Sequence, residues 1–167
     1  MTIRHTIALT AALTALTTAG IAQSTATVKR SLQALYNQED AAAAKKDIPG
    51  MLADLSPDYK VSMKNGLTMN LAQMKIQAQQ LMSMARTITN RTTVQKVTVK
   101  GGQALAAVKE HTVLLMMNPQ SHKPAHVVVD SQTQDVWVKS KGAWKKSKSS
   151  GLTQVTTVDG KVMPQMR

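Results

Sequence analysis

The stretch "QALAAVKEHTVLLMMNPQSHKPAHVVVDSQTQDVWVKS", residues 103–140, decides the fold. Two runs of alternating apolar and polar residues flank a segment with two prolines, which is typical of antiparallel strands joined by a loop. In both runs the apolar residues stand at odd positions near the loop and at even positions farther away. The change falls across "KEHT" (109–112) and "DSQTQD" (130–135), at facing places of the hairpin. We therefore expect a β-bulge or sharp bend there, and a strongly bent sheet.

The segments on either side extend this sheet. "TVQKVTVK" (93–100) and "AWKKSKSSGLTQVTTV" (143–158) also alternate, and the turns "GG" and "KG" connect them to the central hairpin. A further short strand is predicted at "YKVSMK" (59–64), before a turn at Asn65 and Gly66. Residues 87–158 are therefore predicted to form a long antiparallel meander.

The N-terminal half has a helical pattern. Val28, Leu32, Leu35 and Tyr36 recur at helical spacing in a first helix. Pro49 suits the first turn of a short second helix, with Asp47 or Ile48 near its cap. A third helix over 68–85 places its apolar side chains on one side, after Thr68 or Asn70 as N-cap; these side chains are Leu71, Met74, Ala78, Leu81 and Met82. Helices followed by strands indicate an α+β domain, with the helices packed on one face of a curved antiparallel sheet.

Both tryptophans of the chain lie in "DVWVKSKGAWKKSK", residues 135–148. If "KG" is a two-residue turn, Lys139 faces Trp144, Trp137 faces Lys146, and Asp135 faces Lys148. Val136 and Val138 then occupy the other face, which suits burial better than a row of lysines. The sequence thus predicts that the tryptophans brace the polar outer face of a hairpin by packing against lysine side chains.

Residues 1–22 have the layout of a secretory signal peptide. "MTIRH" is followed by the uncharged run "TIALTAALTALTTAGIA", with small residues Gly20 and Ala22 before a polar stretch. Cleavage after Ala22 would leave a single domain at 23–167 in the periplasm or outside the cell. Because the chain has no cysteine, a lipoprotein anchor and disulfides are excluded.

The chain is strongly basic. Without residues 1–22, which include Arg4 and no acid, 20 basic and 9 acidic side chains remain, a net charge of +11. Such a surplus favours contact with anionic envelope polymers or lipid head groups. Specific nucleic-acid binding is not expected, because two tryptophans, two tyrosines and no phenylalanine provide few surfaces for base stacking.

Two segments carry a resemblance to a known superfamily: "LQALYNQEDAAAAKKDIPGMLADLSPDYKV" (32–61) and "DVWVKSKGAWKKS" (135–147). They resemble the opening helices, first strand and penultimate hairpin of nuclear transport factor 2-like proteins, especially SnoaL-like bacterial members. The resemblance implies a cone, in which a bent sheet of the cystatin-like type wraps around helices and leaves a cavity at its wide end. It also implies that Tyr36, on the first helix, is a candidate hydrogen-bonding residue of that cavity.

Candidate site residues cluster at the predicted bend and near the cavity. Glu110, His111 and Asp130 are the catalytic candidates, since a histidine beside a carboxylate forms an acid/base pair when the two converge in a dry cavity. Tyr36, Tyr59 and His111 are the candidates for ligand binding. Neighbours on a regular strand point to opposite faces, so Glu110 and His111 converge only if the bend re-aims one of them.

No metal site or cofactor is expected. His122 and His126 have the spacing of ligands on one side of a helix, but Pro119 and Pro124 prevent a helix there. The sequence also contains no glycine-rich phosphate loop and no nucleophile elbow.

The sequence favours a binding role over catalysis. We expect an exported protein that binds a small apolar or amphipathic ligand, or a protein partner, in or beside the cone cavity, with a homodimer through the sheet as a further partner. One alternative is a cavity hydrolase, dehydratase or isomerase that uses His111, Glu110 or Asp130. The other is a basic envelope protein that contacts anionic polymers or lipid head groups.

Overall fold

A computed structural model describes residues 24–64, 66–117 and 123–163. The described elements are, in chain order, α1 (Thr25–Ala44), α2 (Ile48–Leu52), β1 (Leu55–Met63), β2 (Thr68–Asn70), α3 (Leu71–Met84), β3 (Ala85–Lys100), β4 (Gln103–Met117), β5 (Pro124–Ser140), β6 (Ala143–Val158) and β7 (Lys161–Val162). The predicted order of helices before a long meander is confirmed.

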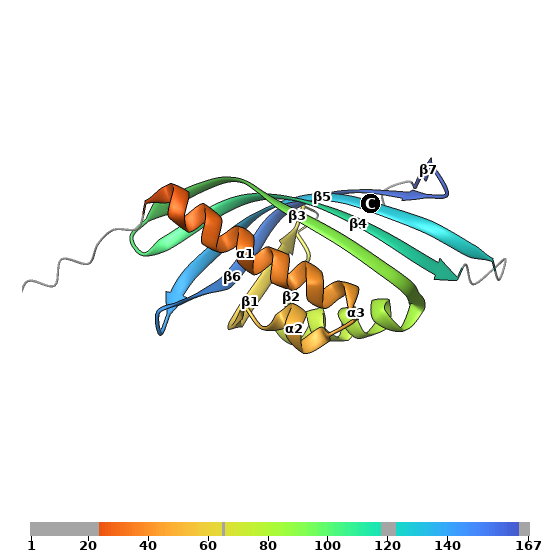
Figure 1. Cartoon of the computed structure of the whole chain (residues 1–167), viewed down its shortest axis with the longest axis horizontal. Coiled ribbons are helices and arrows are strands. Elements are labelled where there is room, and N and C mark those ends of the chain that lie inside the picture. Colours follow the sequence, from red (N-terminus) through yellow and green to blue (C-terminus); the bar gives the residue numbers. More distant parts are fainter. Residues whose placement is uncertain (1–23, 65, 118–122, 164–167) are drawn as a thin grey trace, which may run out of the picture.

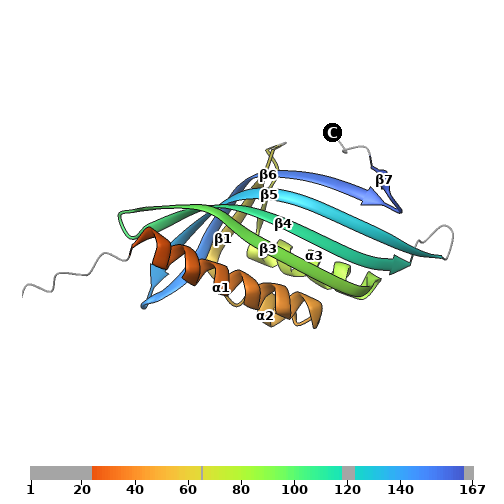
Figure 2. The same ribbon diagram turned by 45° about the horizontal axis from the view of Figure 1, so that its top comes forward.

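The described strands form one strongly curved sheet. Its order is β2-β1-β6-β5-β4-β3. The short strand β7 pairs with the C-terminal end of β6, beyond the part that pairs with β1. Four long strands, β3 to β6, pair antiparallel as predicted, whereas β1 pairs parallel to β6. Figures 1 and 2 show these strands arching over the helices, with α1 lying across the concave side. The fold is thus the predicted α+β architecture, with a mixed rather than wholly antiparallel sheet.

Local signals place the helices correctly. Ser24 caps α1 by accepting a hydrogen bond from the amide of Thr27, and Asp47 caps α2, with Pro49 in its first turn. Asn70 rather than Thr68 caps α3, and it forms a capping box with Gln73. The five apolar residues predicted on one side of α3 are its half-buried or buried residues. The first and third helices, α1 and α3, therefore bury the apolar side chains that the sequence predicted.

The predicted change of buried face in β4 and β5 is wrong. Even-numbered residues of β4 face the helices at both ends of the strand, from Ala104 to Leu114, and so do odd-numbered residues of β5, from Ala125 to Trp137. His111 faces Asp130 rather than Ser131, so the hairpin register also differs by one residue from the expected one. The polar residues at 109–112 and 130–135 do not mark a switch of faces.

The bulges lie in the flanking strands instead. In β3 the pairing with β4 skips Gln95. In β6 it shifts twice against β5, around Ser147 and around Gly151, whose φ of 69° is in the left-handed region that favours glycine. As a result, the buried residues of β6 change from even numbers, Trp144 and Lys146, to the odd-numbered Ser149. These bulges bend the sheet as the sequence predicted, but in different strands.

The tryptophans face the core, not the outer surface. The turn and the predicted pairs Lys139–Trp144 and Trp137–Lys146 are confirmed, whereas Asp135 faces Ser149 because of the bulge at Ser147. Trp137 is fully buried and Trp144 nearly so. The predicted packing against lysines is confirmed, since Nζ of Lys139 lies 5.4 Å from the ring centroid of Trp144 and Nζ of Lys146 lies 5.3 Å from that of Trp137, but the predicted outer placement is wrong. Large aromatic side chains gain more from burial against α1 than valine does, so the valine face of β5 turns outward.

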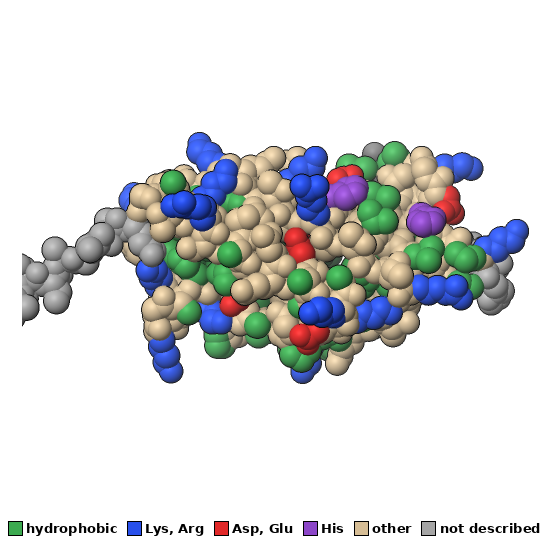
Figure 3. Space-filling view, in the orientation of Figure 1, with side chains coloured by type: hydrophobic (Ala, Val, Ile, Leu, Met, Phe, Trp, Pro, Cys, Tyr) green, Lys and Arg blue, Asp and Glu red, His purple; other side chains and the backbone are tan. Residues whose placement is uncertain are grey.

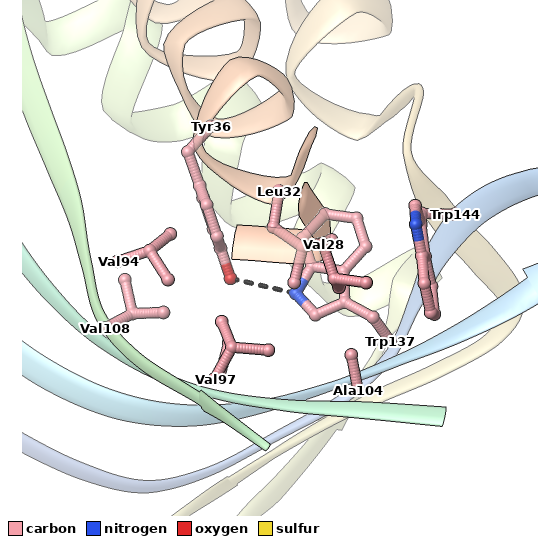
Figure 4. Packing of buried hydrophobic residues seen from close by; sticks show 10 residues of the cluster. Val28, Leu32, Tyr36, Val94, Val97, Ala104, Val108, Trp137 and Trp144 are labelled. Atoms are coloured by element: carbon pink, nitrogen blue, oxygen red, sulfur yellow. Dashed lines mark hydrogen bonds between the residues drawn. The ribbon is translucent and has the colours of Figure 1, made fainter. Parts of the chain in front are cut away.

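Two apolar clusters fill the space between the helices and the sheet. The tryptophan cluster, partly shown in Figure 4, comprises Val28, Leu32, Tyr36, Val94, Val97, Ala104, Ala106, Val108, Trp137 and Trp144. The methionine cluster lies farther along the strands, and its buried members Ala43, Met82, Ala85, Ile88 and Leu114 are flanked by half-buried Ile48, Met51, Leu81, Met116 and Val127. Polar residues separate the two clusters.

None of the helices within the described ranges is long and apolar enough to cross a membrane. The predicted signal peptide, residues 1–22, lies outside the described residues.

Candidate functional site

A band of polar side chains crosses the interior between the two clusters. Along β4 the inward residues run from Val108 through Glu110 and Thr112 to Leu114, and the same sequence of apolar, polar and apolar residues occurs in α1 and β3. We call this the interior polar band; its members are Tyr36, Glu39, Asp40, Tyr59, Asn90, Thr92, Glu110, Thr112, Ser131, Asp135, Lys146 and Ser149. The inward-facing residues of the polar runs in β4 and β5 therefore belong to the same interior polar band.

Lys146 lies at the centre of the band and is only 7% exposed. Its Nζ donates a hydrogen bond to Oε2 of Glu39 at 2.9 Å and lies 3.9 Å from Oδ2 of Asp135. The ammonium group also lies 4.6 Å from the ring centroid of Tyr36 and 5.3 Å from that of Trp137. Burial disfavours the charge, but the carboxylates of Glu39 and Asp135 outweigh it and raise the pKa of Lys146 well above its ordinary value. Lys146 is therefore a fixed internal cation.

Tyr36 connects the helix to the strand that carries Asp135 and Trp137. Its hydroxyl donates a hydrogen bond to Oδ2 of Asp135 and accepts one from the indole Nε1 of Trp137 at 3.1 Å (Figure 4 shows the latter). Burial, more than any neighbour, raises the pKa of Tyr36, so the phenol keeps its proton. Asp135 is 4% exposed, and its Oδ1 has no hydrogen-bond partner in the described structure. A buried carboxylate oxygen without a donor is costly, which singles out Asp135.

Glu39 and Glu110 form the more open margin of the band. The side chain of Glu39 is 30% exposed and that of Glu110 is half-buried. Within the described structure Glu110 has only long contacts: Ser131 donates to Oε2 at 3.4 Å, and the hydroxyl of Thr112 lies 3.3 Å from Oε1 but donates its proton to Asn90. Burial raises the pKa of Glu39, and the negative charges of Glu110 and Asp135 add to this effect while Lys146 opposes it. Two carboxylates thus face the concave side with unused hydrogen-bonding capacity.

Tyr59 is the residue of β1 that belongs to the interior polar band. Its hydroxyl donates a hydrogen bond to Oγ of Ser149 at 2.8 Å, and burial raises the pKa of the phenol. Tyr59 and its neighbours on β1 also border a shallow surface hollow of about 360 Å³ between β1 and the start of α3. Of the predicted ligand-binding residues, Tyr36 and Tyr59 therefore both reach the interior polar band.

Two of the three predicted catalytic candidates, His111 and Asp130, come together, but Glu110 does not join them. Glu110 faces the concave side, whereas His111 and Asp130 lie on the convex face, where Nδ1 of His111 is 2.9 Å from Oδ1 of Asp130. Their side chains are 49% and 47% exposed, and they border an open hollow of about 270 Å³ with Arg91 and Lys109. The regular alternation of β4 thus separates Glu110 from His111.

The sequence interpretation missed Glu39, Asp135 and Lys146. Asp135 belongs to the polar run of β5, which was a signal for it, whereas Glu39 and Lys146 lie on α1 and β6, outside the polar runs of β4 and β5. The described residues contain no group of three histidine, aspartate or glutamate side chains placed to hold a metal ion.

Comparisons with known proteins identify the architecture. No family model and no curated protein matches the sequence. Among solved structures, a nuclear transport factor 2-like superfamily protein from Salmonella enterica has a TM-score of 0.60 and 16% identity, covering 78% of this chain and 92% of that one.

Two further structures have the same arrangement. A type 2 hexachlorocyclohexane dehydrochlorinase has a TM-score of 0.60 and 11% identity over 83% of this chain and 90% of its own. A domain with a cystatin-like fold from Nostoc punctiforme has a TM-score of 0.57 and 18% identity, covering 76% of this chain and 77% of that domain. The chain therefore has the nuclear transport factor 2-like, cystatin-like fold that its two sequence segments resembled.

Proposed function

We propose that this domain binds a small amphipathic molecule on its concave side, at the margin of the interior polar band. The observation that carries the proposal is the adjacency of incompletely bonded carboxylates to apolar side chains. Glu110 and Thr112 lie directly beside Leu114 and Met116 on the inward face of β4. The polar end of a ligand would contact Glu110 and Glu39, and its apolar part would contact the methionine cluster.

The apolar wall has adaptable side chains. Met116, Val127 and Leu81 are half-buried at the edge of the methionine cluster, and they come from three different elements. Methionine side chains adjust to ligands of different shape because they are unbranched and flexible. This favours an apolar chain or ring as the second part of the ligand.

Titration of the protein with amphipathic probes, followed by the fluorescence of its two tryptophans, tests the proposal. Trp137 is near Lys146, so occupancy of the band should change its emission. Met116→Gln should weaken binding about tenfold by placing an amide in the apolar wall. Met117→Gln is the matched control, because Met117 is the next residue on the strand and is exposed. Equal binding by both variants and the wild type would count against the concave site.

Acid–base catalysis is a second candidate, favoured by the raised pKa of Glu39 beside Glu110. Two neighbouring carboxyl groups in different surroundings are suited to proton transfer, one as the acid and the other as the base. The dehydrochlorinase named above shows that an enzyme uses this fold. An activity found in a substrate screen should be lost in both Glu39→Gln and Glu110→Gln. It should persist in His111→Ala, because His111 lies on the convex face.

A further inference from the structure

We infer that the polar end of the ligand is cationic, an ammonium or a similar donor group that contacts Glu39 and Glu110. The inference rests on the proposed function and adds the charge of the ligand to it.

The strong donors of the band already have partners. The phenols of Tyr36 and Tyr59 donate to Asp135 and Ser149, and the indole of Trp137 donates to Tyr36. The ammonium of Lys146 donates one hydrogen bond to Glu39, and it also lies near Asp135 and the rings of Tyr36 and Trp137. An anionic ligand would therefore have to displace existing hydrogen bonds.

The next layer toward the methionine cluster is satisfied as well. Asp40 accepts from the amide of Asn90 at 2.9 Å and from the backbone amide and the hydroxyl of Thr92, both at 2.7 Å. Thr112 donates to Oδ1 of Asn90 at 2.5 Å. Asp40 is thus occupied by protein donors and is not part of the proposed contact.

The atoms left short of partners are acceptors. Oδ1 of Asp135 has no partner among the described residues, although the side chain is nine-tenths buried or more. Glu39 makes its hydrogen bond through Oε2, and among the described residues Glu110 accepts only a long hydrogen bond, from Ser131 at 3.4 Å, since Thr112 donates to Asn90. A donor placed at this margin would shorten or replace weak contacts, with little loss of existing ones.

The excess of acidic side chains in the band also favours a cationic ligand. It contains the carboxyl groups of Glu39, Asp40, Glu110 and Asp135 and one cationic side chain, Lys146. The rest of the chain has a large excess of bases over acids, since the whole sequence carries 21 lysines and arginines against 9 acids. The interior therefore has the opposite sign to the surface, and a cationic group gains more there than elsewhere on the molecule.

Three probes with the same apolar chain separate charge from hydrophobicity: octylamine, octanol and octanoate. Octylamine should bind about tenfold more tightly than octanol, the difference expected for a hydrogen bond to a charged acceptor, and octanoate should bind most weakly. Tryptophan fluorescence and calorimetry at constant ionic strength measure the three affinities.

Two matched variants locate the contact. Glu110→Gln removes one negative charge from the concave side, and Asp130→Asn removes one from the neighbouring strand on the convex face. The preference for octylamine over octanol should fall about fivefold or more in Glu110→Gln and stay unchanged in Asp130→Asn. Thermal unfolding of each variant checks that its fold is retained.

The outcomes distinguish the two claims. Equal affinity for octanol and octylamine, or an equal effect of both variants, would overturn the cationic assignment and leave the amphipathic site standing. If none of the three probes binds up to its solubility limit, the proposed function itself fails, and the assignment fails with it.

Discussion

At the scale of single residues, Lys146 supplies the positive charge that pairs with the acids of the interior polar band. It is the cation nearest to Asp135 and Glu39, and all three are removed from bulk water to different degrees. A buried charge that loses its partner destabilises a protein much more than an apolar pair in the same place would.

Lys146→Met should therefore reduce the free energy of unfolding by about 3–5 kcal/mol at neutral pH. The reason is that Asp135 and Glu39 would remain without a cation. Urea denaturation measures this change. The double variant Asp135→Asn, Lys146→Met should recover part of the loss, because the amide carries no charge. A loss that is the same in the single and the double variant would show that Lys146 acts through packing alone.

Glu39 predicts a pH dependence of stability. Because its pKa is raised on folding from the ordinary 4.5, its contribution is fully present below that pH and is lost as pH rises through the folded-state pKa. Glu39→Gln does not titrate, so the stability of the variant relative to wild type should increase with pH above about 4.5.

Asp58 provides a control of opposite sign for this measurement. A hydrogen bond from Ser56 lowers the pKa of this exposed carboxyl group, so its contribution is lost as pH falls. Asp58→Asn should therefore lose stability relative to wild type as pH rises. This loss should occur at a lower pH than the change expected for Glu39→Gln. Parallel curves for the two variants would refute the account of Glu39.

Single residues of the site were only partly predictable. Tyr36 and Glu110 could be named, because helical spacing and a polar interruption mark them. Asp135 and Lys146 were assigned to a polar outer face, since alternation alone does not say which face of a strand is buried. The deciding energy is the burial of Trp137 against α1, which depends on residues about 100 positions away.

At the scale of elements, the helices follow local rules and the strands do not. Caps, proline and apolar spacing all lie within a few residues of one another, so the three helices could be predicted from the sequence. The register of β4 with β5 and the bulges in β3 and β6 depend on pairing between distant segments. This is why the bend was predicted but its place was wrong.

The N-terminus of α3 tests a local rule directly. Asn70→Ala should reduce stability by about 1 kcal/mol, because the Asn70 side chain accepts the amide hydrogen bond of Gln73. Thr68→Ala is the matched control, since Thr68 was the alternative cap but lies exposed in β2. Denaturation midpoints of the two variants should differ; equal midpoints would contradict the assignment of the cap.

At the scale of the whole molecule, charge is distributed by depth. Figure 3 shows lysine and arginine side chains spread over the visible face, with few carboxylates among them. The acids of the interior polar band lie between two apolar clusters instead. The basic surface thus keeps like charges apart in solvent, where they are screened, while most of the charged groups in the interior are acids.

The overall architecture was largely predictable, and one pairing was not. Helices before a meander, together with the two segments resembling nuclear transport factor 2-like proteins, led to the correct fold. The parallel pairing of β1 with β6 joins segments about 90 residues apart and leaves no periodic mark in either. Such a contact follows from the way the whole sheet curves around the helices.

Export is the last property to be tested on the whole chain. We propose that residues 1–22 are removed, so that the mature protein begins at Gln23. The described fold suits this cut, because Ser24 would remain to cap α1 at Thr25. The protein recovered from the periplasm or medium should have the mass of 23–167, and a purified 23–167 chain should unfold at the same temperature as the exported protein. Recovery of the intact 167-residue chain from the membrane fraction would overturn the proposal.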